Sequence, residues 1–203
     1  MGYVITVVVS YLLGCSSMAH YLGKAKKMDI REHGTGNLGA SNTAVTMGWG
    51  AAILVGAHDV GKGALAVLLV RWIFPELELA PYVAGVACVL GHIFPFYLGF
   101  RGGKGLASFM GMTAALNIPL CLVALGILIL VTVTTNYIAL GSLTVCVLVP
   151  IAIAFMTGSP WPVLILLVAT LVMFWKHWIN IRRILAGTEI GLRKTVKGED
   201  KVK

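Results

Sequence analysis

The sequence predicts an all-α integral membrane protein with seven transmembrane helices, an external N-terminus and a cytoplasmic C-terminus. Three observations support this fold class. The 203 residues are 58% hydrophobic and only 12% charged, with a mean hydropathy of +0.90. That composition excludes a disordered chain, and a small soluble core could not bury so much apolar surface. Apolar stretches of bilayer-crossing length recur along the chain, and its 16 basic residues cluster between them.

Seven apolar stretches define the predicted spans. They cover about residues 2–23, 50–73, 80–100, 106–116, 118–134, 138–157 and 161–176. Region 106–135 is split because Asn117 and Pro119 interrupt it, and proline breaks or kinks a helix. The piece 106–116 rises only about 16 Å, which is short for a crossing helix. The first stretch has neither a basic leader nor an A-x-A cleavage pattern, so we expect a retained span.

Basic residues set the expected orientation. Four lie between residues 24 and 31, two at 101 and 104, and eight from 176 onwards, which is 14 of the 16. With the split near residue 117 all of these face one side, and that side is cytoplasmic by the positive-inside tendency. The exceptions are Lys62, within a span, and Arg71, near a span end. We expect one transmembrane domain, residues 1–203, with a basic cytoplasmic tail from about residue 182.

Four polar segments face the same side in this topology. They read KAKKMDIREHGTGNLGASNT, GFRGGKG, TTNYIALGS and KHWINIRR. Loops held by a rigid scaffold often carry function, so we expect one site where these four segments meet.

Two of the segments are rich in glycine. Residues Gly34–Gly39 spell GxGxxG, but a membrane helix precedes them, and a dinucleotide site needs a preceding strand. Their backbone N–H groups can still bind an anion in front of a helix; the alternative is a plain tight turn. The RGGKG segment, residues 101–105, suits a phosphate, although its two cations would also serve as a membrane anchor.

Polar residues inside the spans have two possible roles each. Asp59 and Lys62 lie three residues apart and can form a helix-packing ion pair or act directly in the site. The surrounding GAHDVGKG string lacks the Ser or Thr of a nucleotide-binding loop. His92 can hydrogen-bond a neighbouring helix. His177 and Asn180 can hold a phosphate or anchor the helix at the interface. The four cysteines are expected to be small core residues.

These segments together resemble the bacterial integral-membrane acyl-phosphate:glycerol-3-phosphate acyltransferases. The matching strings are YLLGCSSMAHYLGK, DIREHGTGNLGASN, HDVGKG, VLGHIFPFYLGFRGGKG, NYIALGS and KHWINIRRILAGTE, in this order over nearly the whole chain. The resemblance implies seven spans in the bacterial cytoplasmic (inner) membrane and a cytoplasmic active site. It implies transfer of a fatty acyl group from acyl phosphate to the 1-hydroxyl of glycerol 3-phosphate, giving lysophosphatidic acid. It implies no cofactor and no nucleic-acid partner.

The resemblance also implies the site residues. Lys104, Thr35 and His177 are expected to be catalytic, with Lys104 contacting phosphate and stabilising transition-state charge. Substrate binding is expected from Gly36, Asn37, Ser41, Asn42, Arg101, Gly102, Gly103, Ser142 and Asn180. The hydroxyl proton would pass to a phosphate oxygen of a substrate, or to His177. No metal cluster stands out in the sequence, so we expect activity in the presence of a chelator.

The sequence departs from the family pattern at several positions. Val45 stands where arginine is expected and Ala139 where serine is common, and Trp178 and Ile179 replace an Arg–Glu pair. The His-x4-Asp pair of other glycerolipid acyltransferases is absent. Two alternatives therefore stay open: a small membrane transporter of anions or lipids, and a family member with altered or lost activity.

Overall fold

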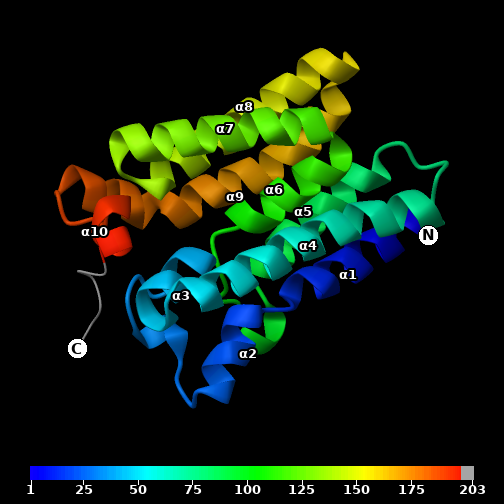
Figure 1. Ribbon diagram of the computed structural model, residues 1–203. Helices are drawn as coiled ribbons and strands as arrows, with labels where there is room; N and C mark the ends of the chain where they lie inside the picture. The colour runs from blue at the N-terminus through cyan, green and yellow to red at the C-terminus, as the bar shows by residue number, and fades with distance from the viewer. Residues whose placement is uncertain (198–203) are drawn as a thin grey trace.

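The computed structural model describes residues 1–197, and all regular structure within them is helical (Figure 1). The longer helices are α1 (Gly2–Cys15), α4 (Trp49–Ile73), α5 (Ala80–Ile93), α6 (Leu106–Leu116), α7 (Ile118–Thr135), α8 (Ile138–Thr157) and α9 (Pro160–Leu185). The short ones are α2 (Met18–Ala25), η1 (Ile30–Glu32), α3 (Ala40–Met47), η2 (Phe96–Leu98) and α10 (Leu192–Lys197).

Six segments within residues 1–197 are long and apolar enough to cross a membrane. They are Gly2–Ala25, Trp49–Ile73, Ala80–Leu98, Ile118–Thr135, Ile138–Thr157 and Pro160–Leu185. The predicted break in region 106–135 is confirmed, because α6 ends at Leu116 and α7 starts at Ile118. Asn117 is extended between them, and its side chain accepts the backbone N–H of Leu120 at 2.8 Å. Pro119 lies in the first turn of α7, where its missing N–H has no cost.

The first predicted span is not one continuous helix, which corrects the expectation for residues 2–23. α1 ends at Cys15, and Ser16 and Ser17 are extended before α2 begins. Ser17 caps α2, since its side chain accepts the N–H of His20 at 3.3 Å. The break also turns the carbonyl of Ser16 toward Lys62, whose ammonium donates to it at 2.6 Å.

Two further boundaries differ from the prediction. α5 ends at Ile93 rather than near residue 100, because Pro95 disfavours a helical conformation for the residue before it. α9 continues to Leu185 instead of ending at 176, so Arg182 and Arg183 lie in its last turn. The predicted tail therefore begins inside α9 and includes α10. Its Lys201 and Lys203 lie outside the described residues.

The core lies between α5, α6, α8 and α9. Its fully buried side chains include Phe109, Met112, Val145, Leu166 and Met173. α7 covers this core from outside, and of its 18 residues only Ala124 and Thr132 are buried. Three of the four cysteines are buried and the fourth, Cys121, is half-buried, which confirms their core placement.

Glycines bring the helices of the first half into close contact. The Cα of Gly63 on α4 lies against the carbonyl of Ser108 on α6, and Gly111 on α6 lies against the carbonyl of Val60 on α4. Gly14 on α1 and Gly91 on α5 pack in the same reciprocal way. Membrane helices associate through small residues because lipid offers no hydrophobic driving force. The α4–α6 contact matters for function because α6 begins directly after Lys104.

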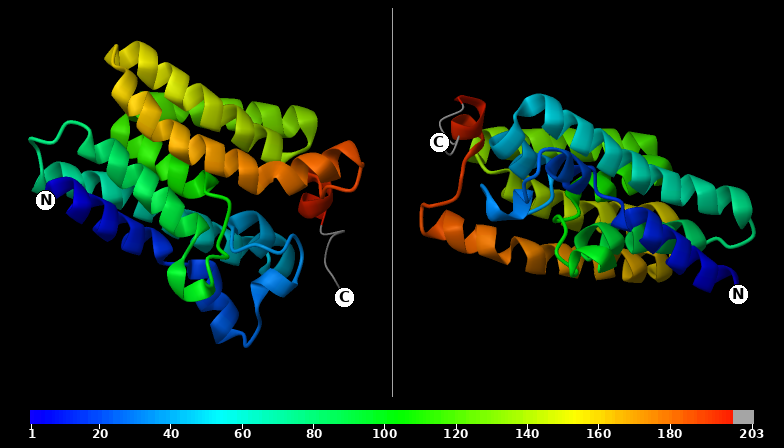
Figure 2. Two further views of the ribbon diagram at one scale, coloured as in Figure 1. Left: turned by 180° about the vertical axis from the view of Figure 1, so that it is seen from behind. Right: turned by 90° about the horizontal axis from the view of Figure 1, so that it is seen from below.

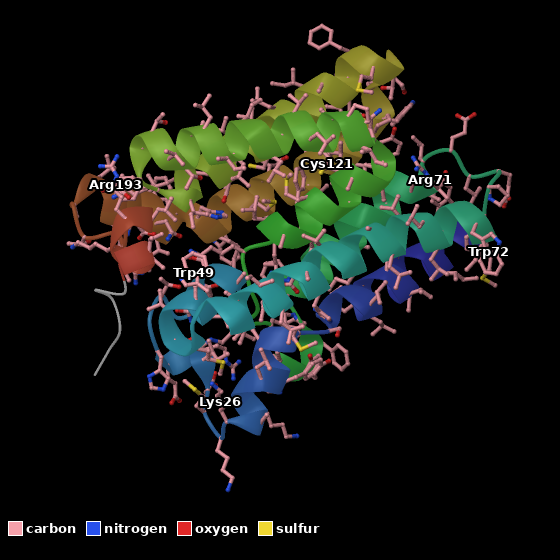
Figure 3. All side chains as sticks on the ribbon, viewed as in Figure 1. Lys26, Trp49, Arg71, Trp72, Cys121 and Arg193 are labelled. Carbon is pink, nitrogen blue, oxygen red and sulfur yellow. The ribbon has the colours of Figure 1, made fainter. Side chains whose placement is uncertain are left out.

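The two ends of the bundle differ. One end carries α2, α3, α10 and the loops between them, while the α4–α5 and α8–α9 connections lie at the other (Figures 1 and 2). Trp49 and Trp72 mark opposite ends of α4, about 35 Å apart at 1.5 Å per residue (Figure 3). Both are largely exposed, as expected for aromatic side chains at membrane interfaces. Beside Trp72, the Arg71 guanidinium donates to the last carbonyls of α6, those of Ala115 and Leu116.

The glycine contact predicts a stability difference between two helical Gly→Ala variants. In Gly111→Ala the new methyl group would lie on the backbone of Val60, so α4 and α6 must separate, at a cost of about 1–3 kcal/mol. Gly126 on α7 has open space around its Cα, so Gly126→Ala should be neutral or slightly stabilising. Thermal unfolding in detergent measures both. Equal melting temperatures for the two variants would contradict the packing argument.

Candidate active site

A cavity of about 320 Å³ lies at the loop-rich end of the bundle. All four polar segments that the sequence predicts to converge contribute to its wall, together with α4 and residues 189–195. Seven of the predicted site residues line it: Thr35, Asn37, Ser41, Lys104, Ser142, His177 and Asn180. These residues come from positions up to 145 apart in the chain, so only the tertiary fold brings them together.

The other five predicted site residues lie off the cavity wall: Gly36, Asn42, Arg101, Gly102 and Gly103. Arg101 is exposed outside it. The backbone N–H groups of Gly102 and Gly103 are already engaged, donating to the carbonyls of Ile93 at 3.1 Å and His92 at 3.2 Å. In this structure these glycines fix the loop before Lys104 to the end of α5. Substrate contact by the five residues stays a prediction.

Asn42 organises the first glycine-rich loop from within. It is completely buried, and its side-chain oxygen accepts the N–H of Thr35 at 2.6 Å. Its amide nitrogen donates to the carbonyls of Ile30 at 3.0 Å and Asn37 at 2.9 Å. Gly34, with φ of +59°, packs its Cα against the same side chain. The loop is thereby held in one conformation in which Thr35 and Asn37 face the cavity.

The N-terminus of α3 opens into the cavity without a side-chain cap. Gly39 is its N-cap residue, and glycine has no side chain that could cap the first turn. The first N–H groups of a helix have no partner inside the helix, and they attract anions. Gly39, Ala40 and Ser41 all line the cavity. The expected glycine-rich loop is followed by a helix start at the cavity, and anion binding there stays a prediction.

Lys104 is an ammonium group without a partner. Within residues 1–197 it forms no ion pair and no hydrogen bond, although it is half-buried in the cavity wall. The pKa of Lys104 is lowered to about 8, mainly by burial and also by nearby Arg183 and Lys176, while Glu189 opposes the shift. An anion in the cavity would supply the missing partner.

Two hydrogen-bond acceptors face the same cavity from α9. His177 is buried and its Nδ1 lies 2.8 Å from the carbonyl of Met173, so Nδ1 carries the proton and Nε2 is left as an acceptor. Asn180 donates its amide to Glu189 at 2.5 Å, and its oxygen is buried without a partner in the described part of the chain. Neutral hydroxyl groups are the natural ligands for such acceptors.

Sequence reasoning missed three residues of the wall or underestimated them. Glu189, in the tail, accepts a hydrogen bond from the amide of Asn180 and so orients it. The signal in the sequence was that Glu189 is an acidic residue within a basic segment. Asp59 and His92 line the cavity and also belong to a buried ion-pair network with Lys62. For Asp59 the two open alternatives, helix packing and a place in the site, are therefore compatible. Val45 and Ala139, the two departures from the family pattern, also line the wall.

The tail closes one side of the cavity. Ile190 and Leu192 line it, and Asn136 in the α7–α8 turn holds this segment in place. Asn136 adopts a left-handed conformation with φ of 72°, so that its carbonyl accepts the N–H of Leu192 at 2.8 Å. Its side-chain oxygen accepts the N–H of Arg193 at 2.9 Å. Figure 3 shows Arg193 at the same end of the molecule as Trp49.

Known proteins match the chain over most of its length. Residues 4–187 match the sequence profile of the family described as glycerol-3-phosphate acyltransferase. The protein named glycerol-3-phosphate acyltransferase from Shouchella clausii (strain KSM-K16) is 43% identical, covering 93% of this chain and 95% of the relative. The one from Thermoanaerobacter pseudethanolicus (strain ATCC 33223 / 39E) is 39% identical, with coverages of 96% and 98%.

Two solved structures have the same fold. Both are crystal structures of PlsY (YgiH), described as an integral membrane glycerol 3-phosphate acyltransferase. The glycerol 3-phosphate form superposes with a TM-score of 0.87 at 28% identity, covering 95% of this chain and 96% of that one. The lysophosphatidic acid form superposes with a TM-score of 0.84 at 28% identity, covering 94% and 95%.

The Asn136 contacts predict how firmly the tail is held. Asn136→Gly keeps the left-handed backbone but removes the acceptor for Arg193, so the equilibrium constant for docking of residues 189–195 should fall about fivefold. Hydrogen exchange at Arg193 reports this directly. Asn136→Asp retains an oxygen at the same place and is the matched control, with protection expected to stay near the wild-type level. Unchanged protection in Asn136→Gly would show that the side-chain contact does not hold the tail.

Proposed function

Because the chain belongs to the glycerol-3-phosphate acyltransferase family, we propose that it transfers a fatty acyl group from acyl phosphate to the 1-hydroxyl of glycerol 3-phosphate. The product is lysophosphatidic acid. One observation carries the proposal: an ammonium, an uncapped helix N-terminus and two acceptors, all without partners within residues 1–197, meet in one cavity of a membrane-embedded bundle. Both substrates are anionic, one of them carries hydroxyl groups, and the other carries a lipid chain.

The cationic part of the wall is proposed to bind phosphate. Lys104 supplies a positive charge, which attracts an anion more strongly in a half-buried site than in water. The first N–H groups of α3 point into the cavity as hydrogen-bond donors. Thr35 and Ser41 add hydroxyl groups. Val45 stands in this wall where the family pattern has a cation, so phosphate binding here relies on Lys104 and the helix start.

The acceptors on α9 are proposed to bind the hydroxyl groups of glycerol 3-phosphate. Nε2 of His177 and the oxygen of Asn180 can each accept one O–H bond. Ser142 donates its own hydroxyl to the carbonyl of Ile138 at 2.8 Å, so it too offers an acceptor. This arrangement orients the glycerol end while Lys104 holds phosphate.

The reaction needs no separate leaving-group activation. The 1-hydroxyl oxygen attacks the acyl carbon, and the bond from that carbon to the phosphate oxygen breaks. The hydroxyl proton is proposed to pass to the departing phosphate, which leaves as hydrogen phosphate, so that atoms and charges balance. Lys104 would stabilise the negative charge that develops on the carbonyl oxygen of the acyl group and on the departing phosphate.

We infer seven crossings with the N-terminus outside, and a site facing the cytoplasm of a bacterial inner membrane. The short α6 supports the seventh crossing, because it starts at the cavity and ends beside Arg71, at the opposite end of α4. The loop-rich end carries most of the basic residues, and the opposite end carries Glu76 and Glu78.

Purified protein tests the proposal directly. Given acyl phosphate and glycerol 3-phosphate, the wild type should form lysophosphatidic acid and inorganic phosphate in equal amounts. Lys104→Met keeps the length of the side chain but removes the charge, and should lower kcat/KM at least about 100-fold. Lys26→Met, at an exposed lysine far from the cavity, is the matched control and should remain close to wild type (Figure 3). Wild-type protein that forms no product would refute the proposal.

The pKa of Lys104 predicts an alkaline limit. In the free enzyme this group is charged below about pH 8 and neutral above it. Because kcat/KM reports the free enzyme, it should fall about tenfold per pH unit above that value. Phosphate monoesters are already dianionic there, so substrate ionisation does not interfere. Lys104→Arg stays charged at every accessible pH, so its kcat/KM should not fall above pH 8. The same alkaline fall in kcat/KM in both proteins would assign this titration to another group.

A further inference from the structure

We propose that His92 is a further substrate-contacting residue, which donates a hydrogen bond from Nε2 to a negatively charged oxygen of the substrate beside Lys104. The inference rests on the proposed function. It starts from the position of His92 near the end of α5, where the side chain is 7% exposed and lines the cavity. The backbone carbonyl of His92 also accepts the N–H of Gly103, the residue before Lys104.

Nε2 of His92 lies close to the Cα of Gly103. A side chain at position 103 would fall directly on this nitrogen, so only glycine fits between the imidazole and the loop. The nitrogen therefore lies against the backbone that leads into Lys104, and His92 and Lys104 line the same cavity.

The partners of Nδ1 decide where the proton of His92 lies. Lys62 Nζ is 3.0 Å from Nδ1, 2.7 Å from Oδ1 of Asp59 and 2.6 Å from the carbonyl oxygen of Ser16. An ammonium has three N–H donors and no acceptor, and these three contacts use all of them. Oδ1 of Asp59 also lies 3.4 Å from Nδ1 of His92, but a proton on Nδ1 would face the ammonium of Lys62, so we assign Nδ1 as the acceptor in its contact with Lys62. The proton of the neutral ring is on Nε2.

This N–H group has no acceptor within residues 1–197. A donor in a cavity wall that has no protein acceptor gains a hydrogen bond when a ligand supplies the acceptor. His177 provides the opposite arrangement, because its Nδ1–H is engaged by a carbonyl and its Nε2 is free to accept. The cavity thus has one imidazole that accepts and one that donates. A hydroxyl suits the first, and an anionic oxygen suits the second.

Two variants of His92 separate substrate contact from helix packing. His92→Asn places an amide oxygen near the position of Nδ1, so Lys62 keeps its acceptor, but the donor at Nε2 is lost. His92→Gln can place an N–H near the position of Nε2, but it withdraws the acceptor from Lys62. We expect His92→Asn to melt like the wild type and to lose about 10- to 100-fold in kcat/KM. His92→Gln should melt lower and recover most of the activity.

The kinetic constants identify the oxygen that is bound. A rise in KM with kcat unchanged in His92→Asn would indicate a ground-state contact with phosphate, and a fall in kcat would indicate the oxyanion formed at the acyl carbon. His58 is the matched control, since it contacts Asp59 at 3.3 Å and Ser16 at 3.0 Å but does not line the cavity. His58→Asn should destabilise the fold while kcat/KM per folded molecule stays within about twofold of wild type.

Wild-type turnover in His92→Asn, or activity in His92→Gln no higher than in His92→Asn, would overturn the inference and leave His92 a packing residue. Absence of product from the wild type would instead refute the proposed function. Imidazole ¹⁵N NMR of the wild type gives a test that needs no variant. We expect a neutral ring protonated at Nε2, whose N–H resonance moves when glycerol 3-phosphate is added. A ring protonated at Nδ1, or an unmoved resonance, would contradict the inference.

Discussion

The buried ammonium of Lys62 is the interaction on which the rest of this structure depends. A charge within membrane-spanning helices is tolerated only when its donors are all satisfied, and here three different elements supply the acceptors. Asp59 comes from the same helix, Ser16 from the break between α1 and α2, and His92 from α5. The break in the first span is therefore a requirement of this charge, because a continuous helix would use the Ser16 carbonyl internally.

Close packing of α4 against α6 links the Lys62 network to the cavity. Gly63 and Gly111 let α4 and α6 approach until their backbones touch, so the start of α6 is fixed relative to the Lys62 network. The loop before α6 is tied to α5 by two backbone hydrogen bonds. Within residues 1–197 the side chain of Lys104 has no partner, but the loop that carries it is held from both sides.

Local patterns in the sequence predict much of this architecture. The hydropathy of α4, α7 and α8 gives their bounds within a residue or two, and Asn117 with Pro119 marks the break after α6. The break at Ser16 could not be predicted in this way, because two serines in an apolar stretch are compatible with a helix. The carbonyl that the break frees bonds to Lys62, 46 residues away. The same limit applies to the site: Thr35 and Lys104 stand in recognisable glycine-rich loops, whereas Glu189 and His92 join the cavity through contacts between distant segments.

The segment that closes the cavity, residues 189–195, is among the last parts of the chain to be synthesised. Thr35 and Lys104 are made early, but Ile190 and Leu192 complete the wall only when nearly the whole chain has been translated. Until these residues leave the ribosome and dock on Asn136, a nascent chain in the membrane has an open, unfinished cavity. The cavity wall is then complete only after all of the apolar helices have been made. A chain cut short before residue 189 would lack this side of the cavity.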